Sequence, residues 1–182
     1  THIFGIPGDY VLTFYDRLVE SKLKVIGTCT EIGAGFAADG YARVHGLGAV
    51  CVTYCVGGFN VLNAVAGAYA EKSPLIVISG SPGIAERTRS PLLHHQVRDF
   101  RTQLEIYEKV TCASCSLDDP RDAGRRIDET IAACLSYKRP VFIEIPRDMV
   151  NQPCTAPTTG TLKALTRRSD KATLDEAVTE AV

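Results

Sequence analysis

Residues 49–79 read AVCVTYCVGGFNVLNAVAGAYAEKSPLIVIS, two short apolar runs on either side of a glycine pair and a longer apolar segment. The runs at 49–54 and 74–79 lack polar alternation, which is typical of parallel strands covered on both faces. The segment 58–71 between them has the length and composition of a buried helix. This stretch therefore predicts a strand, a crossover helix and a second strand parallel to the first.

The same alternation continues on both sides of this unit. Further strands are expected at 1–5, 24–28, 108–113 and 140–145, and further helices at 11–20, 31–45 and 119–136. This order predicts an α/β fold with a doubly wound, six-stranded parallel sheet flanked by helices. Ligands of such sheets bind beyond the carboxyl ends of the strands, so we expect the functional side chains there. The connection 80–107 is unusually long, and long connections in compact domains are commonly functional.

Charge and hydropathy exclude two classes of partner. The chain has 182 residues, and 20 Lys and Arg against 21 Asp and Glu give a net charge of −1. Such a balance offers no broad basic surface to nucleic acid or to an anionic membrane. Residues 44–70 contain no Asp, Glu, Lys or Arg, but Gly57-Gly58, Asn60 and Asn63 interrupt them. A buried strand and helix explain this window better than a membrane span.

The seven cysteines lie mostly inside apolar runs, where a reduced cysteine packs as a small hydrophobic residue. Their odd number indicates a reducing compartment, and we expect a cytoplasmic protein. Cys112-x-x-Cys115 has neither a second cysteine pair nor histidines at a suitable spacing, so we expect no metal site in this chain.

The composition changes after residue 150. Residues 151–170 are rich in Thr and Pro without an apolar period, which predicts a linker. Residues 171–182 begin a new amphipathic helix, which we interpret as the start of a truncated following domain. We therefore expect a domain over 1–150 that belongs to a longer chain.

Four ionisable residues are candidates for a site. Asp9 and Glu31 each follow a predicted strand, and His94 and His95 lie in the long connection. Each has a simpler interpretation: Asp9 as a helix N-cap, Glu31 as a first-turn carboxylate, and the histidines as solvated side chains. Because the strand ends share one edge of the sheet, the four together predict a site with two carboxylates and two imidazoles.

Two glycine motifs invite comparison with phosphate-binding loops. Gly33-x-Gly35-x-x-Ala38 resembles a dinucleotide fingerprint, but no acidic residue ends the next strand, and Glu31 lies where a pyrophosphate needs free amides. Gly57-Gly58 has no basic neighbour. We expect this pair to allow close packing of a strand against a helix rather than to bind phosphate.

Five motifs resemble, in the same order, the pyrimidine-binding domain of the thiamine-diphosphate-dependent 2-oxo acid decarboxylases. They are FGIPGDY (4–10), TEIGAGFAADGYAR (30–43), VTYCVGGFNVLNAVAGAYAEKSPLIVISGSPG (52–83), LLHH (92–95) and RPVFIEIPRDMV (139–150). The resemblance covers residues 1–150 and is strongest to the phenylpyruvate and indolepyruvate branch. It implies a flavodoxin-like parallel sheet.

The resemblance also implies how the cofactor is held. The family's glutamate at the position of Glu31 contacts N1′ of the aminopyrimidine, and further cofactor contacts are expected from Thr53, Gly57 and Asn63. A carboxyl that shares a proton with N1′ calls for an apolar setting that raises its pKa, which we expect around Glu31.

The remaining candidates would handle protons. By resemblance, Asp9, His94 and His95 protonate the carbon left by decarboxylation and assist aldehyde release. The diphosphate and Mg²⁺ are expected to bind a C-terminal domain that these residues do not include, so the chain should be inactive alone. The family's active sites form between two chains, which implies a homodimer or a dimer of dimers.

The implied activity is the conversion of an aromatic or bulky 2-oxo acid to an aldehyde and CO2. One alternative is a carboligating enzyme of the acetolactate-synthase type, and another is a non-catalytic domain that acts as a structural or regulatory partner. Without the resemblance, the pattern alone would indicate a flavodoxin-like binding domain.

Overall fold

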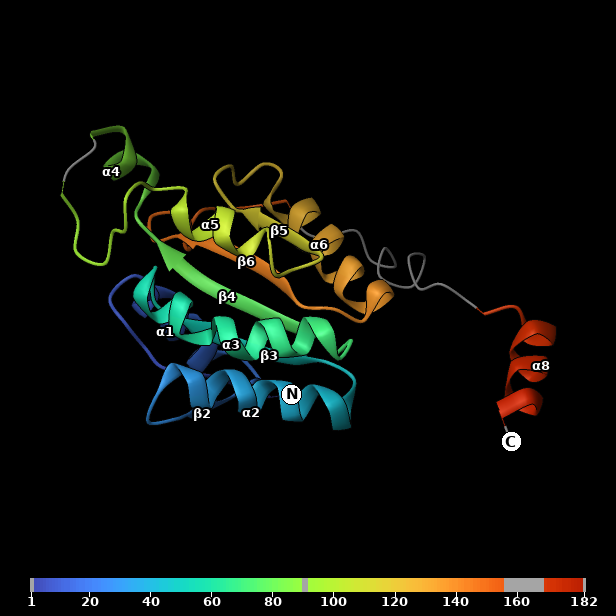
Figure 1. Cartoon of the computed structure of the whole chain (residues 1–182). Coiled ribbons are helices and arrows are strands. Elements are labelled where there is room, and N and C mark those ends of the chain that lie inside the picture. The colour runs from blue at the N-terminus through green and yellow to red at the C-terminus, as the bar shows by residue number, and fades with distance from the viewer. Residues whose placement is uncertain (1, 90–91, 156–168, 182) are drawn as a thin grey trace.

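The computed structural model describes residues 2–89, 92–155 and 169–181, and its centre is one parallel sheet (Figure 1). The strands are β1 (His2–Gly5), β2 (Lys24–Gly27), β3 (Gly48–Val52), β4 (Leu75–Ser81), β5 (Ala113–Ser116) and β6 (Val141–Pro146). Their order in the sheet is β2-β1-β3-β4-β6-β5, and every neighbouring pair is parallel. The predicted six-stranded parallel sheet is confirmed.

Helices cover both faces of the sheet. They are α1 (Leu12–Glu20), α2 (Glu31–His45), α3 (Val56–Ala70), α4 (Ile84–Arg89), α5 (Thr102–Tyr107) and α6 (Ala123–Tyr137), followed by α8 (Lys171–Ala181). Residues of α2, α3 and α5 share one core cluster with the inner strands, whereas α1 and α6 pack in clusters on the opposite face. In Figure 1, α2 and α3 lie side by side along the sheet. The fold is therefore doubly wound, as predicted.

The helix predicted at 31–45 matches α2 at both ends, and its caps explain why. The Gly33 amide donates to Thr30 Oγ1 at 3.2 Å, which satisfies one of the free amides of the first turn. Gly46 follows the helix with a φ of 85°, and its amide donates to the Ala42 carbonyl at 2.8 Å. Thr30 is thus the N-cap that places Glu31 at the first position of α2.

The prediction of a strand over 108–113 is wrong. β5 begins at Ala113, and the residues before it continue the turns that end α5. The Val110 amide donates to the Tyr107 carbonyl at 3.1 Å, and Thr111 Oγ1 donates to the same oxygen at 2.7 Å. Local hydrogen bonds therefore hold this apolar stretch in a turn, and the strand forms from the smaller residues that follow.

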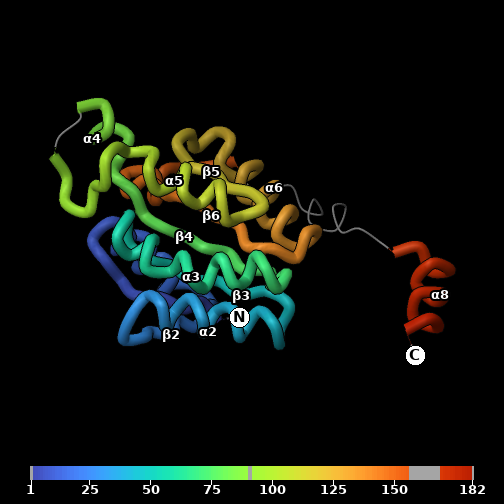
Figure 2. Tube along the Cα trace, in the orientation of Figure 1, coloured from blue at the N-terminus to red at the C-terminus, as the bar shows by residue number. Residues whose placement is uncertain are grey.

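Two further boundaries differ from the sequence prediction. The helix predicted at 119–136 begins later, at Ala123, with Asp122 as its N-cap residue. The connection 80–107 is shorter than expected because β4 continues to Ser81, and it contains two short helices, α4 and α5. Figure 2 shows the chain between β4 and α5 extending beyond the end of the sheet.

Residues 156–168, most of the predicted linker, lie outside the described residues. The helix expected in 171–182 is present as α8, and none of its described residues is buried. The division of the chain into domains stays a prediction.

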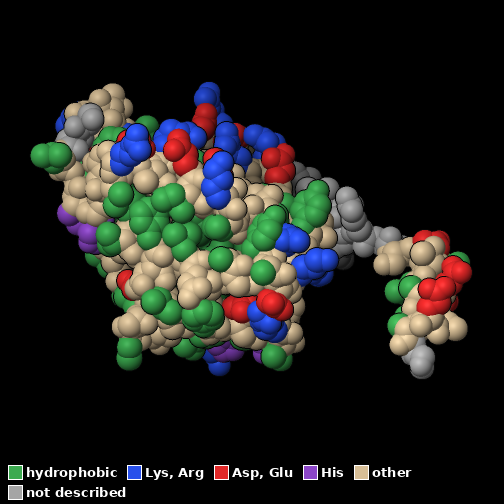
Figure 3. Space-filling view, viewed as in Figure 1, with side chains coloured by type: hydrophobic (Ala, Val, Ile, Leu, Met, Phe, Trp, Pro, Cys, Tyr) green, Lys and Arg blue, Asp and Glu red, His purple; other side chains and the backbone are tan. Residues whose placement is uncertain are grey.

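Among the described residues, no helix has the length and apolar character needed to cross a membrane. On the face in Figure 3, basic and acidic side chains lie next to one another and form no patch of one sign. Exposed ion pairs of the described residues include Arg101–Glu105 and Arg125–Glu129.

Candidate functional site

The candidate site lies at the carboxyl ends of β1, β2 and β3. Asp9 follows β1, Glu31 follows β2 and Thr53 follows β3, and these three strands are neighbours in the sheet. Thr53 Oγ1 donates to Asp9 Oδ1 at 3.4 Å. The chain reverses its direction of winding between β1 and β3, and ligands of doubly wound folds bind at such a switch point. The predicted convergence at one sheet edge is confirmed for Asp9 and Glu31.

Asp9 does not cap a helix. The N-cap residue of α1 is Val11, and no side chain caps that helix. Instead, Asp9 Oδ2 is hydrogen-bonded to His94 Nε2. Partial burial by itself would raise the pKa of Asp9, but the hydrogen bond and charge of His94, together with His95 and Thr53, hold that pKa below its ordinary value. The interpretation of Asp9 as an N-cap is therefore wrong.

The side chains of His94 and His95 lie close together and beside Asp9, although the two residues are consecutive. His95 has a φ of 66°, in the left-handed region that non-glycine residues rarely adopt. The ring centroids of His94 and His95 are 4.8 Å apart in an edge-to-face arrangement. The Tyr10 ring packs against His94 in a tilted arrangement with 5.1 Å between centroids, and its hydroxyl donates to the His94 carbonyl at 3.1 Å. Asp9, His94 and His95 thus form one cluster, as the sequence predicts.

The same cluster has the donor set of a metal ligand group. One ligand atom from each of Asp9, His94 and His95 lies within 4.8 Å of the others. Two imidazoles and a carboxylate are a common set for divalent transition metals. The expectation of no metal site in this chain therefore stays a prediction.

Glu31 lies beside the N-terminus of α3. Asn60 Nδ2 donates to Glu31 Oε2 at 2.7 Å. Among the described residues, none donates a hydrogen bond to Oε1, and a Cβ at residue 57 would lie 3.6 Å from this oxygen. Gly57 therefore places no side chain beside Oε1. Glu31 is only partly buried and has a polar partner, so the described residues do not form the apolar setting that we expect from the sequence.

The glycine pair packs closely against two different neighbours: Gly57 lies against Thr53 at the end of β3, as the predicted strand–helix packing requires, whereas Gly58 lies against helix α5. A Cβ at Gly57 would lie 2.8 Å from Thr53 Cγ2, and one at Gly58 would lie 2.6 Å from Gln103 Oε1. Thr53 also fills the space beside Gly8, where a Cβ would lie 2.5 Å from Thr53 Cβ. Thr53 is therefore packed between the loop of Asp9 and the start of α3.

Two polar residues of the site have little signal in the sequence. Asn60 contacts Glu31, whereas Asn63, one turn further along α3, is exposed. A position in the first turn after a glycine pair is the one sign that could have favoured Asn60. Gln103 is fully buried, and its Oε1 accepts from the Cys55 amide at 2.6 Å, which fixes the start of α3. The roles of Thr53, Gly57 and Asn63 toward a cofactor stay predictions.

Comparison with known proteins gives one family. Residues 1–105 match the family described as "Thiamine pyrophosphate enzyme, N-terminal TPP binding domain". The chain is 48% identical over 151 residues to an indole-3-pyruvate decarboxylase of Azospirillum brasilense, covering 82% of this chain and 28% of the relative. It is 49% identical over 150 residues to a pyruvate decarboxylase of Aspergillus parasiticus, covering 81% and 26%.

A third relative matches over more of the chain. The chain is 42% identical over 180 residues to a probable pyruvate decarboxylase of Schizosaccharomyces pombe, covering 97% of this chain and 32% of the relative. The chain thus spans between 26% and 32% of the length of these three relatives. The family match and the parallel sheet agree with the resemblance found in the motifs: the chain belongs to the thiamine pyrophosphate enzymes and contains their N-terminal, thiamine-pyrophosphate-binding domain.

Proposed function

We propose that these residues are the N-terminal part of a thiamine-diphosphate-dependent, non-oxidative 2-oxo acid decarboxylase that converts a 2-oxo acid to an aldehyde and CO2. The observation that carries the proposal is the cluster of Asp9, His94 and His95 on the sheet edge that also bears Glu31. A domain that only binds the cofactor needs only the Glu31 carboxylate. A group of two imidazoles and a second carboxylate adds the capacity for proton transfer to a substrate.

The residues around Glu31 fit the aminopyrimidine of the cofactor. Gly57 places no side chain beside Oε1, while Asn60 donates to Oε2 and so fixes the orientation of the carboxyl. In the proposed complex, Glu31 Oε1 shares a proton with N1′, and Thr53, Gly57 and Asn63 contribute further contacts. When bound, thiamine diphosphate supplies the carbon nucleophile and the electron-accepting ring that decarboxylation requires.

The histidine cluster is proposed to move protons on the substrate side. Histidine side chains exchange protons near neutral pH, and a carboxylate partner orients the ring that does so. The Asp9 carboxylate, hydrogen-bonded to His94 Nε2, would keep that imidazole in place while it donates a proton to the carbon from which CO2 has left. His95, in edge-to-face contact, would assist the departure of the aldehyde.

The remaining features of the enzyme are proposed from the family. The substrate is an aromatic or bulky 2-oxo acid; the relatives include proteins named for indole-3-pyruvate and for pyruvate. Mg²⁺ and the diphosphate bind a separate C-terminal domain. The enzyme is a homodimer or a dimer of dimers and acts in the cytoplasm.

The test is an assay of a full-length polypeptide that contains these residues. It is supplied with thiamine diphosphate and Mg²⁺ and given pyruvate, phenylpyruvate or indolepyruvate, and aldehyde and CO2 are both measured. Cofactor-dependent release of both products supports the proposal and ranks the substrates. Consumption of the 2-oxo acid without aldehyde would instead favour a carboligating enzyme of the acetolactate-synthase type.

A further inference from the structure

A carboxylate is buried in the middle of the sheet, outside the site described above. Glu144 of β6 is 1% exposed and is paired in register with Ser79 of β4 and Ser116 of β5. Burial raises the pKa of Glu144 above its ordinary value. A buried carboxylate is costly to the fold unless hydrogen bonds and charges compensate it, so its partners identify what it does.

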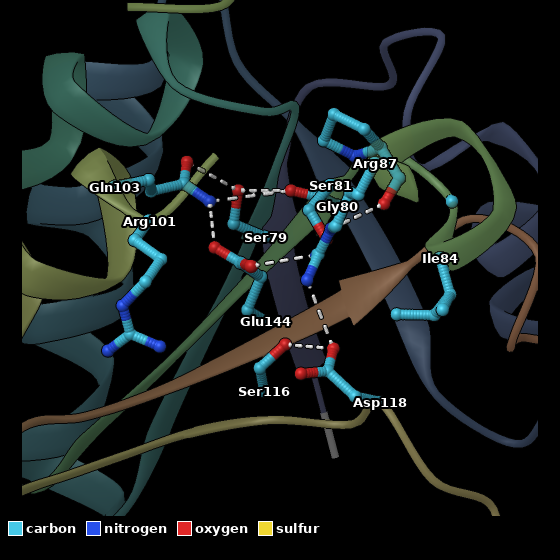
Figure 4. A network of polar contacts seen from close by, with 12 residues as sticks. Ser79, Gly80, Ser81, Ile84, Arg87, Arg101, Gln103, Ser116, Asp118 and Glu144 are labelled. Atoms are coloured by element: carbon cyan, nitrogen blue, oxygen red, sulfur yellow. Dashed lines mark hydrogen bonds and ion pairs between the residues drawn. The ribbon is translucent and has the colours of Figure 1, made fainter. Parts of the chain in front are cut away.

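Its first partner is Arg87 of α4, as Figure 4 shows. Arg87 Nη2 donates to Glu144 Oε1 at 3.1 Å and to Ser81 Oγ at 2.5 Å. The other guanidinium nitrogens donate to the Pro82 carbonyl at 3.0 Å and to Asp118 Oδ1 at 3.1 Å. Each of the three guanidinium nitrogens therefore donates at least one hydrogen bond, and together these bonds fix α4 to the end of the sheet.

Its second partner is Gln103 of α5. Gln103 Nε2 donates to Glu144 Oε2 at 2.9 Å, and Gln103 Oε1 accepts from Ser79 Oγ at 3.1 Å (Figure 4). Gln103 Oε1 also accepts from the Cys55 amide at 2.6 Å. The amide has only one workable orientation, because a flip would turn its NH2 group toward the Cys55 N–H. Gln103 therefore needs an acceptor at the position of Glu144.

These two partners lie on either side of the histidine loop, which we define as residues 92–101. Arg87 precedes the loop and Gln103 follows it, and each binds a different oxygen of Glu144. None of the described residues in 84–89 and 92–102 is buried. A segment with so few buried contacts depends on its ends for its position.

Other contacts hold one end of the loop but not both. Arg147 pairs with Glu86, and Asp148 Oδ1 accepts from the Ile84 amide at 3.0 Å, so both act on α4. Neither reaches α5. Among these anchors, Glu144 is the residue that joins the two ends.

We propose that Glu144 is a positioning residue: its two carboxylate oxygens hold both ends of the histidine loop, so that His94 and His95 face Asp9. Its effect on catalysis rests on the proposed function, whereas its effect on the loop does not. A misplacement of about 1 Å in a proton-transfer group lowers turnover by roughly 100-fold, so loss of this anchor should be measurable in both respects.

The primary test is Glu144→Gln in the full-length protein. One side of the new amide presents NH2 to a donor, either to Arg87 or to Gln103, so one end of the loop loses its hydrogen bond to residue 144 and is held only by its remaining contacts. Amide hydrogen exchange of residues 92–101 is expected to accelerate by about tenfold or more. With thiamine diphosphate and Mg²⁺ present, kcat is expected to fall roughly 10- to 100-fold.

A second variant restores the hydrogen bonds in a new arrangement. In the double variant Glu144→Gln/Gln103→Glu, the carboxylate at 103 accepts from the Cys55 amide, from Ser79 and from the new amide, whose oxygen accepts from Arg87. Loop exchange and kcat are expected to return to within about threefold of wild type. A residue that merely fills space would show no such rescue.

The matched control is Glu129→Gln, which removes an exposed ion pair with Arg125 on α6 and should change neither readout. Unchanged loop exchange in Glu144→Gln overturns the proposal, as does a double variant that fails to fold or to restore both readouts. If wild type releases no aldehyde or CO2, the proposed function fails, and loop exchange alone still decides whether Glu144 holds the loop.

Discussion

The side-chain oxygen of Gln103 occupies the space that a side chain at Gly58 would need. A Cβ at that position would lie 2.6 Å from Gln103 Oε1, and Gln103 cannot move aside because Glu144 and the Cys55 amide hold its two ends. The Tyr107 hydroxyl also donates to the Gly58 carbonyl at 2.7 Å. The second glycine of the pair therefore allows α3 to pack directly on α5.

The first prediction concerns this contact. Gly58→Ala should lower the free energy of unfolding by about 1–3 kcal/mol, because the methyl group overlaps a side chain that is fixed on all sides. Gly67→Ala is the control in the same helix: nothing lies within 4 Å of its Cβ, so the gain in helix propensity should raise the free energy of unfolding by up to about 1 kcal/mol. Thermal and urea unfolding measure both. Equal effects of the two substitutions would contradict the role assigned to Gln103.

Glu31→Gln should leave the fold intact and lower turnover by about 100-fold or more, because an amide cannot exchange a proton with N1′. Circular dichroism and the aldehyde assay of the full-length protein provide the two measurements. Glu20→Gln, which removes an exposed carboxylate paired with Arg17, is the control and should retain full activity. Activity of the Glu31 variant within about tenfold of wild type would exclude the proposed role.

His94→Ala should slow aldehyde release more than CO2 formation, since the imidazole is proposed to act after CO2 has left. Rapid-mixing measurements of CO2, compared with aldehyde accumulation, separate the two steps. If both steps slow by the same factor, His94 contributes to binding or to the first step, and the assignment of the cluster to the later steps is incorrect.

Acid should weaken the contribution of Asp9 to stability. In the folded chain, the pKa of Asp9 lies below its ordinary value of 3.8. The ionised carboxylate therefore stabilises the fold at pH values above 3.8, and this stabilisation is lost as the pH falls through the pKa of the folded state. The difference in unfolding free energy between wild type and Asp9→Asn should therefore be larger at about pH 6 than at about pH 3. A difference that does not change with pH would show that the His94 contact does not favour ionised Asp9.

Much of the fold could be predicted because its signals are local. The capping residue Thr30 and the left-handed Gly46 define α2 from either end, and apolar runs define the inner strands. β5 could not be predicted, because Ala113–Ser116 contains small and polar residues. Its side chains have a local partner in Asp118, which accepts from Ser116 at 2.6 Å, and a more distant one in Thr130, which donates to Cys115 Sγ at 3.4 Å.

The candidate site, like the fold, could be predicted from the sequence only in part. The carboxyl ends of parallel strands meet at one sheet edge, and this rule alone predicts that Asp9 and Glu31 lie on the same side of the sheet. Asn60, Gln103 and Glu144 could not be found, because each is a single polar residue in an otherwise ordinary segment. Their partners lie at least 23 positions away in the sequence, and only the packed structure shows that these partners compensate them.

The burial of Glu144 also constrains how the domain can come apart. If β6 is in place while α4 and α5 are detached, a carboxylate lies in the sheet interior without Arg87 or Gln103, and such a state is strongly disfavoured. Local opening of the loop ends and separation of the central strands are therefore linked. The histidine pair is assembled in the same cooperative unit as the sheet, so partly unfolded molecules that keep the sheet but lose the pair should be rare.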